Sequence, residues 1–189
     1  MKSEARLIGF DDGPFTFDDE STPLVGVLCR GGGYVEGVVA GEVTVDGDDA
    51  TDVVVSLLAE TGFAATARAI VFDGGAVGGF NVIDLERVHR ELGVPAVALV
   101  RDEPDHDAVR AALRKHFDDA AERERLLTAQ PLVPVELGGQ ASFLRHVGGD
   151  AAELAELLAV HVVRGRTPEP LRIAHLIATA LVERASRGA

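Results

Sequence analysis

Two short apolar runs in this chain end in aspartates. Leu7–Phe10 is followed by Asp11 and Asp12, and Ala69–Phe72 is followed by Asp73. Apolar runs of this length bounded by Gly-rich turns are typical of buried strands, so each aspartate is expected at the carboxyl end of a strand. Open α/β sheets bind their ligands at that edge. These aspartates are therefore candidate metal ligands.

A third group of acids, Asp46, Asp48 and Asp49, follows the apolar stretch that ends at Val45. Two-metal hydrolysis of phosphodiesters needs carboxylates from different strands, because two cations about 4 Å apart must be held with positions open for water and substrate. Asp11 or Asp12, one member of the third group, and Asp73 would provide such a set. The alternative is that these acids cap turns and helices, and for Asp48 and Asp49 capping is favoured.

A glycine-rich segment, residues 74–79, follows the second apolar run. Backbone amides at Gly74 and Gly75 could approach a phosphate ahead of a helix. The spacings of the common nucleotide-binding loops are absent, so a tight turn beside a crowded site explains the glycines equally well. Asn81 lies just before the expected helix, where an N-cap role is favoured over contact with a ligand.

Basic side chains that could meet a phosphate occur in two regions. Arg101 ends a candidate strand, where it could neutralise a transition-state phosphate or make a surface ion pair. Arg164, Arg166 and Arg172 flank a Pro-Glu-Pro turn and could hold a phosphate backbone or neutralise neighbouring acids. His175 lies on a mainly apolar helix, where a buried core role is favoured and a functional role remains the alternative.

Other catalytic chemistries lack their motifs. The six histidines include no HExxH pair, so zinc catalysis is not indicated. Serine catalysis lacks a GxSxG segment. The single cysteine, Cys29, ends an apolar strand and is interpreted as a buried structural thiol.

The hydrophobic pattern predicts one α/β domain over residues 1–189. An antiparallel three-strand meander comes first, followed by a βαβ unit with parallel strands and then by helices and short strands. This order is found in ribonuclease H-like folds and in other mixed α/β folds. The expected strands are 5–11, two within 23–45, 68–73, 95–101, 132–137 and 142–147, and the expected helices are 49–60, 82–92, 105–125, 151–163 and 170–184.

The composition is acidic, with 31 Asp and Glu against 18 Lys and Arg and a net charge of −13. Only Lys2 and Lys115 are lysines, a pattern that resembles halophilic proteins of salt-rich cytoplasm. The alternative is that the charge serves to avoid nucleic acid. One cysteine, no secretory signal and no membrane span together predict a cytoplasmic protein without a membrane partner.

Four ordered motifs resemble an archaeal family, endonuclease dU, which was long catalogued as a domain of unknown function and is similar to endonuclease V. The motifs are Ile8–Phe15, Val43–Thr51, Phe72–Gly75 with Gly78–Val82, and Pro168–His175. The resemblance spans nearly the whole chain. It implies a ribonuclease H-like fold and an Asp, Glu, Asp set that uses magnesium to nick DNA or RNA near a deaminated base.

By the order of these motifs, the resemblance places the catalytic carboxylates at Asp11, Asp46 and Asp73. The middle residue is a Glu in endonuclease V and an Asp here. Arg101 falls near a Lys of endonuclease V and keeps its charge. The implied activity is a Mg²⁺- or Mn²⁺-dependent endonuclease acting on nucleic acid, with DNA favoured and deoxyuridine as the base.

Candidate substrate-binding residues are Asp12, Gly74, Gly75, Asn81, Arg172 and His175. The alternative function is a non-catalytic protein that binds a metal or a phosphorylated ligand on the same fold. The acidic surface and the absence of the middle Glu favour that alternative.

Overall fold

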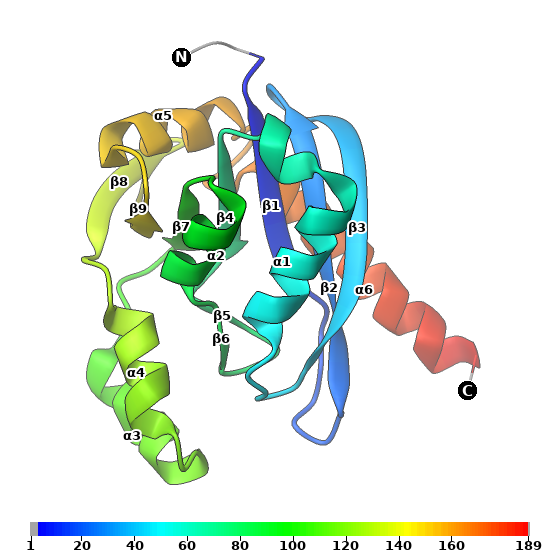
Figure 1. Cartoon of the computed structure of the whole chain (residues 1–189), viewed down its shortest axis with the longest axis vertical. Coiled ribbons are helices and arrows are strands. Elements are labelled where there is room, and N and C mark those ends of the chain that lie inside the picture. The colour runs from blue at the N-terminus through cyan, green and yellow to red at the C-terminus, as the bar shows by residue number, and fades with distance from the viewer. Residues whose placement is uncertain (1–3, 189) are drawn as a thin grey trace.

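Seven strands form one mixed sheet in the order β3-β2-β1-β4-β7-β9-β8 at the centre of the computed structural model, which describes residues 4–188 (Figure 1). The strands are β1 (Arg6–Asp12), β2 (Ser21–Arg30), β3 (Tyr34–Thr44), β4 (Ala69–Asp73), β7 (Ala96–Val100), β8 (Val133–Leu137) and β9 (Gln140–Val147). β1, β2 and β3 form an antiparallel meander, β4 and β7 run parallel to β1, and β8 and β9 form an antiparallel hairpin on β7. The predicted fold class is confirmed.

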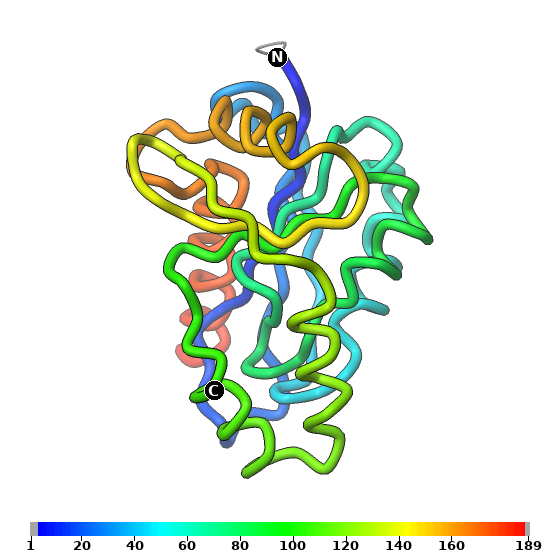
Figure 2. The backbone as a smooth tube through the Cα atoms, turned by 90° about the vertical axis from the view of Figure 1, so that its left-hand side faces the viewer, coloured from blue at the N-terminus to red at the C-terminus, as the bar shows by residue number. Residues whose placement is uncertain are grey.

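Helices cover both faces of this sheet (Figure 2). α1 (Ala50–Thr61) and α2 (Leu85–Leu92) lie on one face, and α5 (Ala151–Val160) and α6 (Glu169–Gly188) lie on the other. α3 (His106–His116) and α4 (Ala120–Thr128) form a hairpin beyond the carboxyl ends of β4 and β7. The remaining elements are a short 3₁₀ helix (Phe63–Thr66) and a small ribbon of β5 (Ala76–Val77) and β6 (Asn81–Val82).

The alternation of side chains along the strands decides which face each residue supports. Ile8 and Phe10 of β1 pack in the core under α1 and α2, whereas Leu7 packs with Leu154 and Leu171 of α5 and α6. Gly9 lets α6 approach, because a Cβ atom there would lie 2.7 Å from the backbone nitrogen of Leu171. α6 therefore lies directly against β1, the strand that carries Asp11.

Two predicted helices have different bounds in the structure. The helix expected over 105–125 is two helices, interrupted where Phe117 is extended and its ring lies 4.3 Å from the Arg123 guanidinium. The helix expected from residue 82 begins at Leu85, and its N-cap is Asp84, whose side chain accepts from the Arg87 N–H. The predicted N-cap role of Asn81 is wrong, because Asn81 belongs to β6. No helix in the range 4–188 has the length and apolar character needed to cross a membrane.

Candidate active site

The register of β1 and β4 brings Asp11 and Asp73 to the same place. Phe10 pairs with Phe72 across these parallel strands, and their rings stack with centroids 5.7 Å apart. The next residue on each strand is an aspartate. Because side chains alternate, both carboxylates project to the opposite face from the phenylalanines, the face that α6 covers. The alternation of side chains along β1 and β4 therefore buries the two phenylalanine rings on one face and places the two carboxylates side by side on the other.

These two carboxylates lie in an environment that opposes their negative charge. Asp11 is 6% exposed, and burial together with repulsion from Asp73 and Asp12 raises its pKa to about 8. Burial also raises the pKa of Asp73, although the nearby Arg101 guanidinium acts in the other direction. Two adjacent carboxylates whose pKa values are raised are stabilised in their charged forms by a bound cation.

Two side chains from other elements reach the pair. The Arg101 Nη2 group, one residue beyond β7, donates to Asp73 Oδ2 at 2.7 Å. His175 of α6 places its Nδ1 atom 3.2 Å from Asp11 Oδ2. The His175 side chain is 59% exposed, so it is not a core histidine. We call Asp11, Asp73, Arg101 and His175 the strand-end cluster.

Arg166 holds the backbone at the end of β7 in place. Its Nη1 group donates to the carbonyl oxygens of Arg101 at 2.6 Å and Ala141 at 2.9 Å, and its Nη2 group donates to Asp102 Oδ1 at 3.1 Å. Arg172, by contrast, makes three hydrogen bonds to Glu169 on its own helix, at 2.6, 2.9 and 3.1 Å. Arg166 and Arg172 thus both bind acidic side chains of the protein. Neutralisation of neighbouring acids was the alternative to phosphate contact in the sequence analysis.

Asp12 and Asp46 point toward the glycine-rich segment. The Gly78 N–H donates to Asp12 Oδ2, and the Gly78 carbonyl oxygen accepts from the Asp46 N–H at 2.7 Å. Asp46 Oδ1 then accepts from the Phe80 N–H at 2.8 Å. Asp46 has a positive φ of 55°, a conformation that Asp and Asn tolerate better than most residues. Asp46 therefore supports the glycine-rich segment.

Asn81 connects β3, α1 and β6 from a fully buried position. Its Oδ1 atom accepts from the Ala50 N–H at 2.9 Å, and its Nδ2 group donates to the Thr44 carbonyl at 2.9 Å and to Asp49 Oδ1 at 2.6 Å. Asp49 also accepts from the Thr44 hydroxyl at 2.7 Å. These bonds use both donors of the amide, so the observed role of Asn81 is structural.

One backbone group of Gly74 and one of Gly75 are hydrogen-bonded within the fold. The Gly74 N–H donates to the Leu99 carbonyl at 2.9 Å, and the Gly75 carbonyl accepts from the Ile83 N–H at 3.0 Å. Gly74 has a φ of 93°, which a residue with a side chain rarely adopts. This glycine therefore turns the chain sharply after Asp73.

The donor set of the strand-end cluster suits a hard divalent cation, because carboxylate oxygens are the side-chain ligands that Mg²⁺ prefers. Within residues 4–188, no group of three or more His, Cys, Asp or Glu side chains has the arrangement of a metal site. Asp11 and Asp73 are thus the two carboxylates of the strand-end cluster. The Asp46 carboxylate is bound to the glycine-rich segment instead. Mg²⁺ is often held by one or two carboxylates together with water and substrate phosphate.

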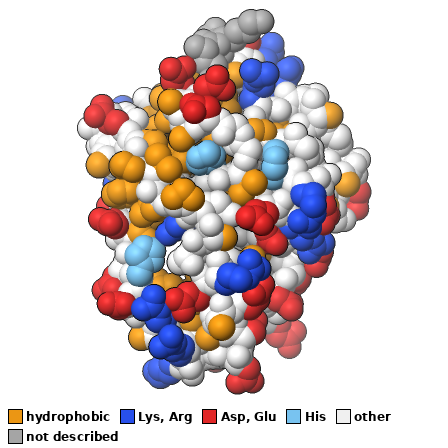
Figure 3. All heavy atoms as spheres, turned by 60° about the vertical axis from the view of Figure 1, so that its left-hand side comes forward, with side chains coloured by type: hydrophobic (Ala, Val, Ile, Leu, Met, Phe, Trp, Pro, Cys, Tyr) orange, Lys and Arg blue, Asp and Glu red, His pale blue; other side chains and the backbone are white. Residues whose placement is uncertain are grey.

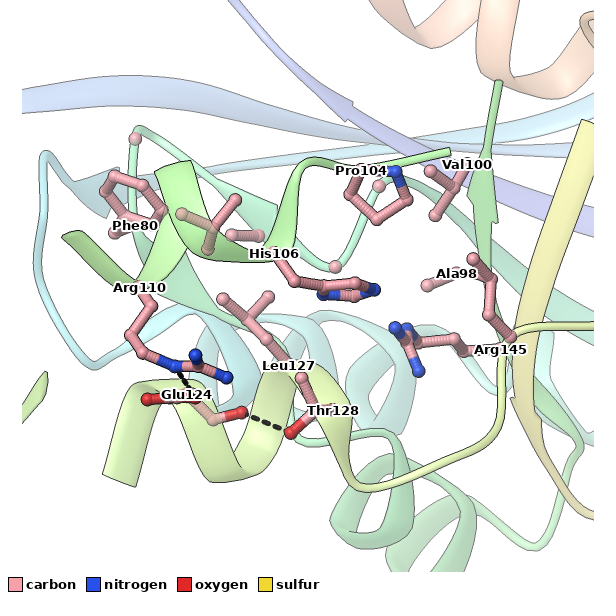
Figure 4. Close-up of a pocket in the computed structure, with 16 residues that line it drawn as sticks. Phe80, Ala98, Val100, Pro104, His106, Arg110, Glu124, Leu127, Thr128 and Arg145 are labelled. Carbon is pink, nitrogen blue, oxygen red and sulfur yellow. Dashed lines mark hydrogen bonds and ion pairs between the residues drawn. The ribbon is translucent and has the colours of Figure 1, made fainter. Parts of the chain in front are cut away.

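On the other side of the same strand ends lies a cavity of about 570 Å³. Its walls come from the end of β7, the glycine-rich segment and the α3–α4 hairpin (Figure 4). The buried Arg145 of β9 lines it, as do Ala98 and Val100. Sequence reasoning missed this cavity. The one indication of it in the sequence is an arginine, Arg145, inside the apolar strand expected at 142–147.

Comparison with known proteins identifies related sequences and structures. The family model described as Endonuclease dU matches residues 3–182. A UPF0215 protein of Thermococcus kodakarensis is 43% identical over 186 residues, which cover 96% of this chain and 94% of that protein.

Two solved structures resemble the fold. A protein of unknown function from Archaeoglobus fulgidus has a TM-score of 0.83 and 32% identity, covering 94% of this chain and 98% of that one. Ciona intestinalis endonuclease V, in complex with DNA containing an inosine followed by a ribo-adenosine, has a TM-score of 0.65. Its identity is 10%, covering 96% of this chain and 87% of that chain, so this second similarity shows the fold alone.

Proposed function

The chain belongs to the endonuclease dU family, and we propose that it is a divalent-metal-dependent endonuclease that nicks nucleic acid at or near a deaminated base. Family membership supports a nuclease. The finer proposal depends on one observation, the pair of buried Asp11 and half-buried Asp73 with Arg101 and His175 in contact with it. Deoxyuridine is the proposed base, and Mg²⁺ or Mn²⁺ the proposed cation.

Asp11 and Asp73 are the residues that would hold the cation. Burial and mutual repulsion raise the pKa of Asp11 to about 8, which favours a positive ligand between these carboxylates. When bound, the cation would activate water and withdraw charge from the phosphate. The chain's own contribution is to bring two oxygen donors together on adjacent parallel strands.

Arg101 and His175 would act on the phosphate from either side of the carboxylate pair. Arg101 binds Asp73 with Nη2, and its remaining N–H groups can donate to a phosphate oxygen. His175 is bound to Asp11 through Nδ1, and its exposed ring leaves Nε2 free to give a proton to the departing oxygen. These roles place a positive charge and a proton source beside one scissile bond.

The net charge of −13 does not prevent approach to this site. Figure 3 shows Lys and Arg side chains interspersed with Asp and Glu on the side that carries the α3–α4 hairpin. The charge does make binding weaker than for a basic nuclease, and divalent cations offset part of it. The DNA-bound endonuclease V of the same fold supports a nucleic acid substrate.

The test is incubation of otherwise identical strands, containing deoxyuridine, deoxyinosine or neither, with wild type and Asp73→Asn in Mg²⁺ or Mn²⁺. We expect nicking of a strand with a deaminated base by the wild type alone. Absence of nicking by the wild type, or equal nicking by Asp73→Asn, would refute the proposal. A divalent-ion thermal shift without cleavage of any nucleic acid would instead support the alternative, a non-catalytic metal-binding protein.

A further inference from the structure

The two edge strands of the sheet differ in how well they are protected against pairing with another chain. β8, at one edge, has only five residues and contains Pro134, which has no N–H to donate. β3, at the other edge, has eleven residues and contains neither proline nor lysine. Short length, proline and lysine are features that keep an edge strand from pairing with another molecule. The protein thus protects the β8 edge and leaves the β3 edge open.

The face of β3 on the α6 side is bare. Val38 pairs with Val27 and Ala40 pairs with Val25 across β2 and β3, so these side chains project to the face on which α6 packs. α6 packs against β1 and β2, and it leaves Val38 45% exposed and Ala40 exposed. α1 packs against the opposite face of β3. Only one face of this edge strand is therefore covered in the described part of the chain.

The side of α6 that points toward β3 is apolar. His175 contacts Asp11 of β1, so the opposite side of the helix is directed away from β1 and toward β3. Ile173, Ile177 and Ala180 lie on that side, at spacings of three and four residues. The two isoleucines pack only partly against β2, and Ala180 is exposed. The C-terminal half of α6 extends past β3 (Figure 1), so an apolar surface continues from the helix to the open edge.

The β3 edge carries little charge, although the chain as a whole has a net charge of −13. Its two charged residues are Glu36 and Glu42. Glu36 is neutralised by Arg6 and by Arg30, whose Nε atom lies 2.9 Å from Glu36 Oε1. Two acidic molecules repel each other least where their surfaces are uncharged. The β3 edge is therefore a surface on which a second copy of this chain can approach.

We propose that two copies of this chain pair along β3 and form a dimer with one continuous sheet. An antiparallel strand that pairs with its own copy is related to it by a two-fold axis perpendicular to the sheet. Pairing centred on Val39 places Val38 opposite Ala40 of the partner subunit, and both residues are apolar. Both α6 helices then lie on the same face of the joined sheet, where they cover the bare side chains.

The dimensions of this surface suit a stable dimer. A strand of eleven residues is about 37 Å long, and the sheet edge with the adjoining helix layer is about 20 Å deep. Each copy would thus bury roughly 700 Å², close to the about 800 Å² per partner of a typical stable interface. Because the two-fold axis reverses the strand direction, the two strand-end clusters lie at opposite ends of the dimer. The association is therefore independent of the proposed function.

The test is the mass of the wild-type protein, measured by light scattering over a range of protein concentrations in about 2 M KCl, where repulsion between acidic chains is screened. We expect a dimer with a Kd of about 10 μM or tighter. Val38→Lys should raise that Kd by at least about a hundredfold, because it places two lysines close to the two-fold axis. Since Val38 is exposed in the single chain, the variant should keep the wild-type fold.

Val163→Lys is the matched control, because Val163 is an exposed valine outside β3 and α6, and its replacement should leave the dimer intact. Hydrogen exchange provides a second measurement on the wild type alone. Dilution below the Kd should speed the exchange of β3 amides and leave β8 amides unchanged.

Three results would overturn the proposal. They are a wild type that stays monomeric at all concentrations, a folded Val38→Lys that dimerises as tightly as the wild type, and a dimer whose β3 amides exchange at the same rate after dilution. Loss of the dimer in Val163→Lys as complete as in Val38→Lys would also contradict an interface along β3.

Discussion

The two faces of the sheet carry groups of opposite charge at the same strand ends. On the α6 face, Asp11 is buried and Asp73 half-buried, and the pKa values of both carboxylates are raised. On the α1–α2 face, Arg145 is a buried guanidinium without a carboxylate partner among residues 4–188. The first region suits a bound cation, and the second offers hydrogen-bond donors.

Other arginines of the protein, unlike Arg145, have carboxylate partners. Arg166, Arg172 and Arg110 all have carboxylate partners within 3.2 Å, and these pairs lie nearer the surface. Arg123 is buried, yet it pairs with Asp119 at 2.8 Å. Arg145 therefore differs from these arginines, because it has no carboxylate partner among residues 4–188.

The largest expected effect follows from removing one carboxylate of the pair. Asp11→Asn or Asp73→Asn should lower nicking by at least about a thousandfold, because each removes a proposed metal ligand. Asp46→Asn is the matched control, since Asn keeps the left-handed backbone and an acceptor for the Phe80 N–H. Nicking rates under single-turnover conditions would compare the three. A loss in Asp46→Asn as large as in Asp73→Asn would place Asp46 in the catalytic set.

Loss of the cation at the end of β7 should have a smaller effect. Arg101→Ala is expected to lower the nicking rate by about ten- to a hundredfold, because one donor to the phosphate is lost while the carboxylates remain. Arg101→Lys should recover part of that rate, since it keeps the charge. An Arg101→Ala enzyme with the wild-type rate would remove Arg101 from the site.

The role of His175 is tested by removing its imidazole. His175→Gln should slow nicking by about tenfold or more, because the proton donor to the departing oxygen is lost. Single-turnover rates at saturating Mg²⁺ would show this change. A His175→Gln enzyme with the wild-type rate would remove His175 from the site.

The smallest effect concerns stability without metal. The pKa of Asp11 is about 8 in the folded protein and about 3.9 in an unfolded chain. Between these values the folded state holds a proton that unfolding releases, so metal-free stability should fall as pH rises through this window. In EDTA, Asp11→Asn should melt several degrees above wild type at pH 8 and at nearly the same temperature at pH 4. A variant no more stable than wild type at pH 8 would contradict the burial of this charge.

Much of the sheet could be predicted from the sequence because β1, β4 and β7 are short, apolar runs, and a Gly-rich turn separates β2 from β3. The adjacency of Asp11 and Asp73 also had a local signal, since each follows an apolar run that ends in Phe. The placement of Asp46 depends on contacts with Gly78 and Phe80, residues distant in sequence. The hydrophobic periodicity of a sequence does not indicate contacts between residues that are distant in the chain.

The cavity was less accessible to sequence reasoning for a related reason. Arg145 is near Ala98 because of strand register, and the α3–α4 hairpin encloses the cavity because the expected helix breaks at Phe117. Arg123 fixes that hairpin by donating to the carbonyl oxygens of Gly47 and Phe80. These are tertiary contacts, and the local pattern 105–125 still favours one continuous helix.

The most direct test of the account is a crystal of the wild-type protein soaked in Mn²⁺, with the ion located by its anomalous scattering. We expect a peak within coordination distance of carboxylate oxygens from both Asp11 and Asp73, with Asp46 still bound to the Phe80 N–H. A peak that excludes either Asp11 or Asp73, or no peak at the strand ends at saturating Mn²⁺, would contradict the assignment of this pair as the metal site.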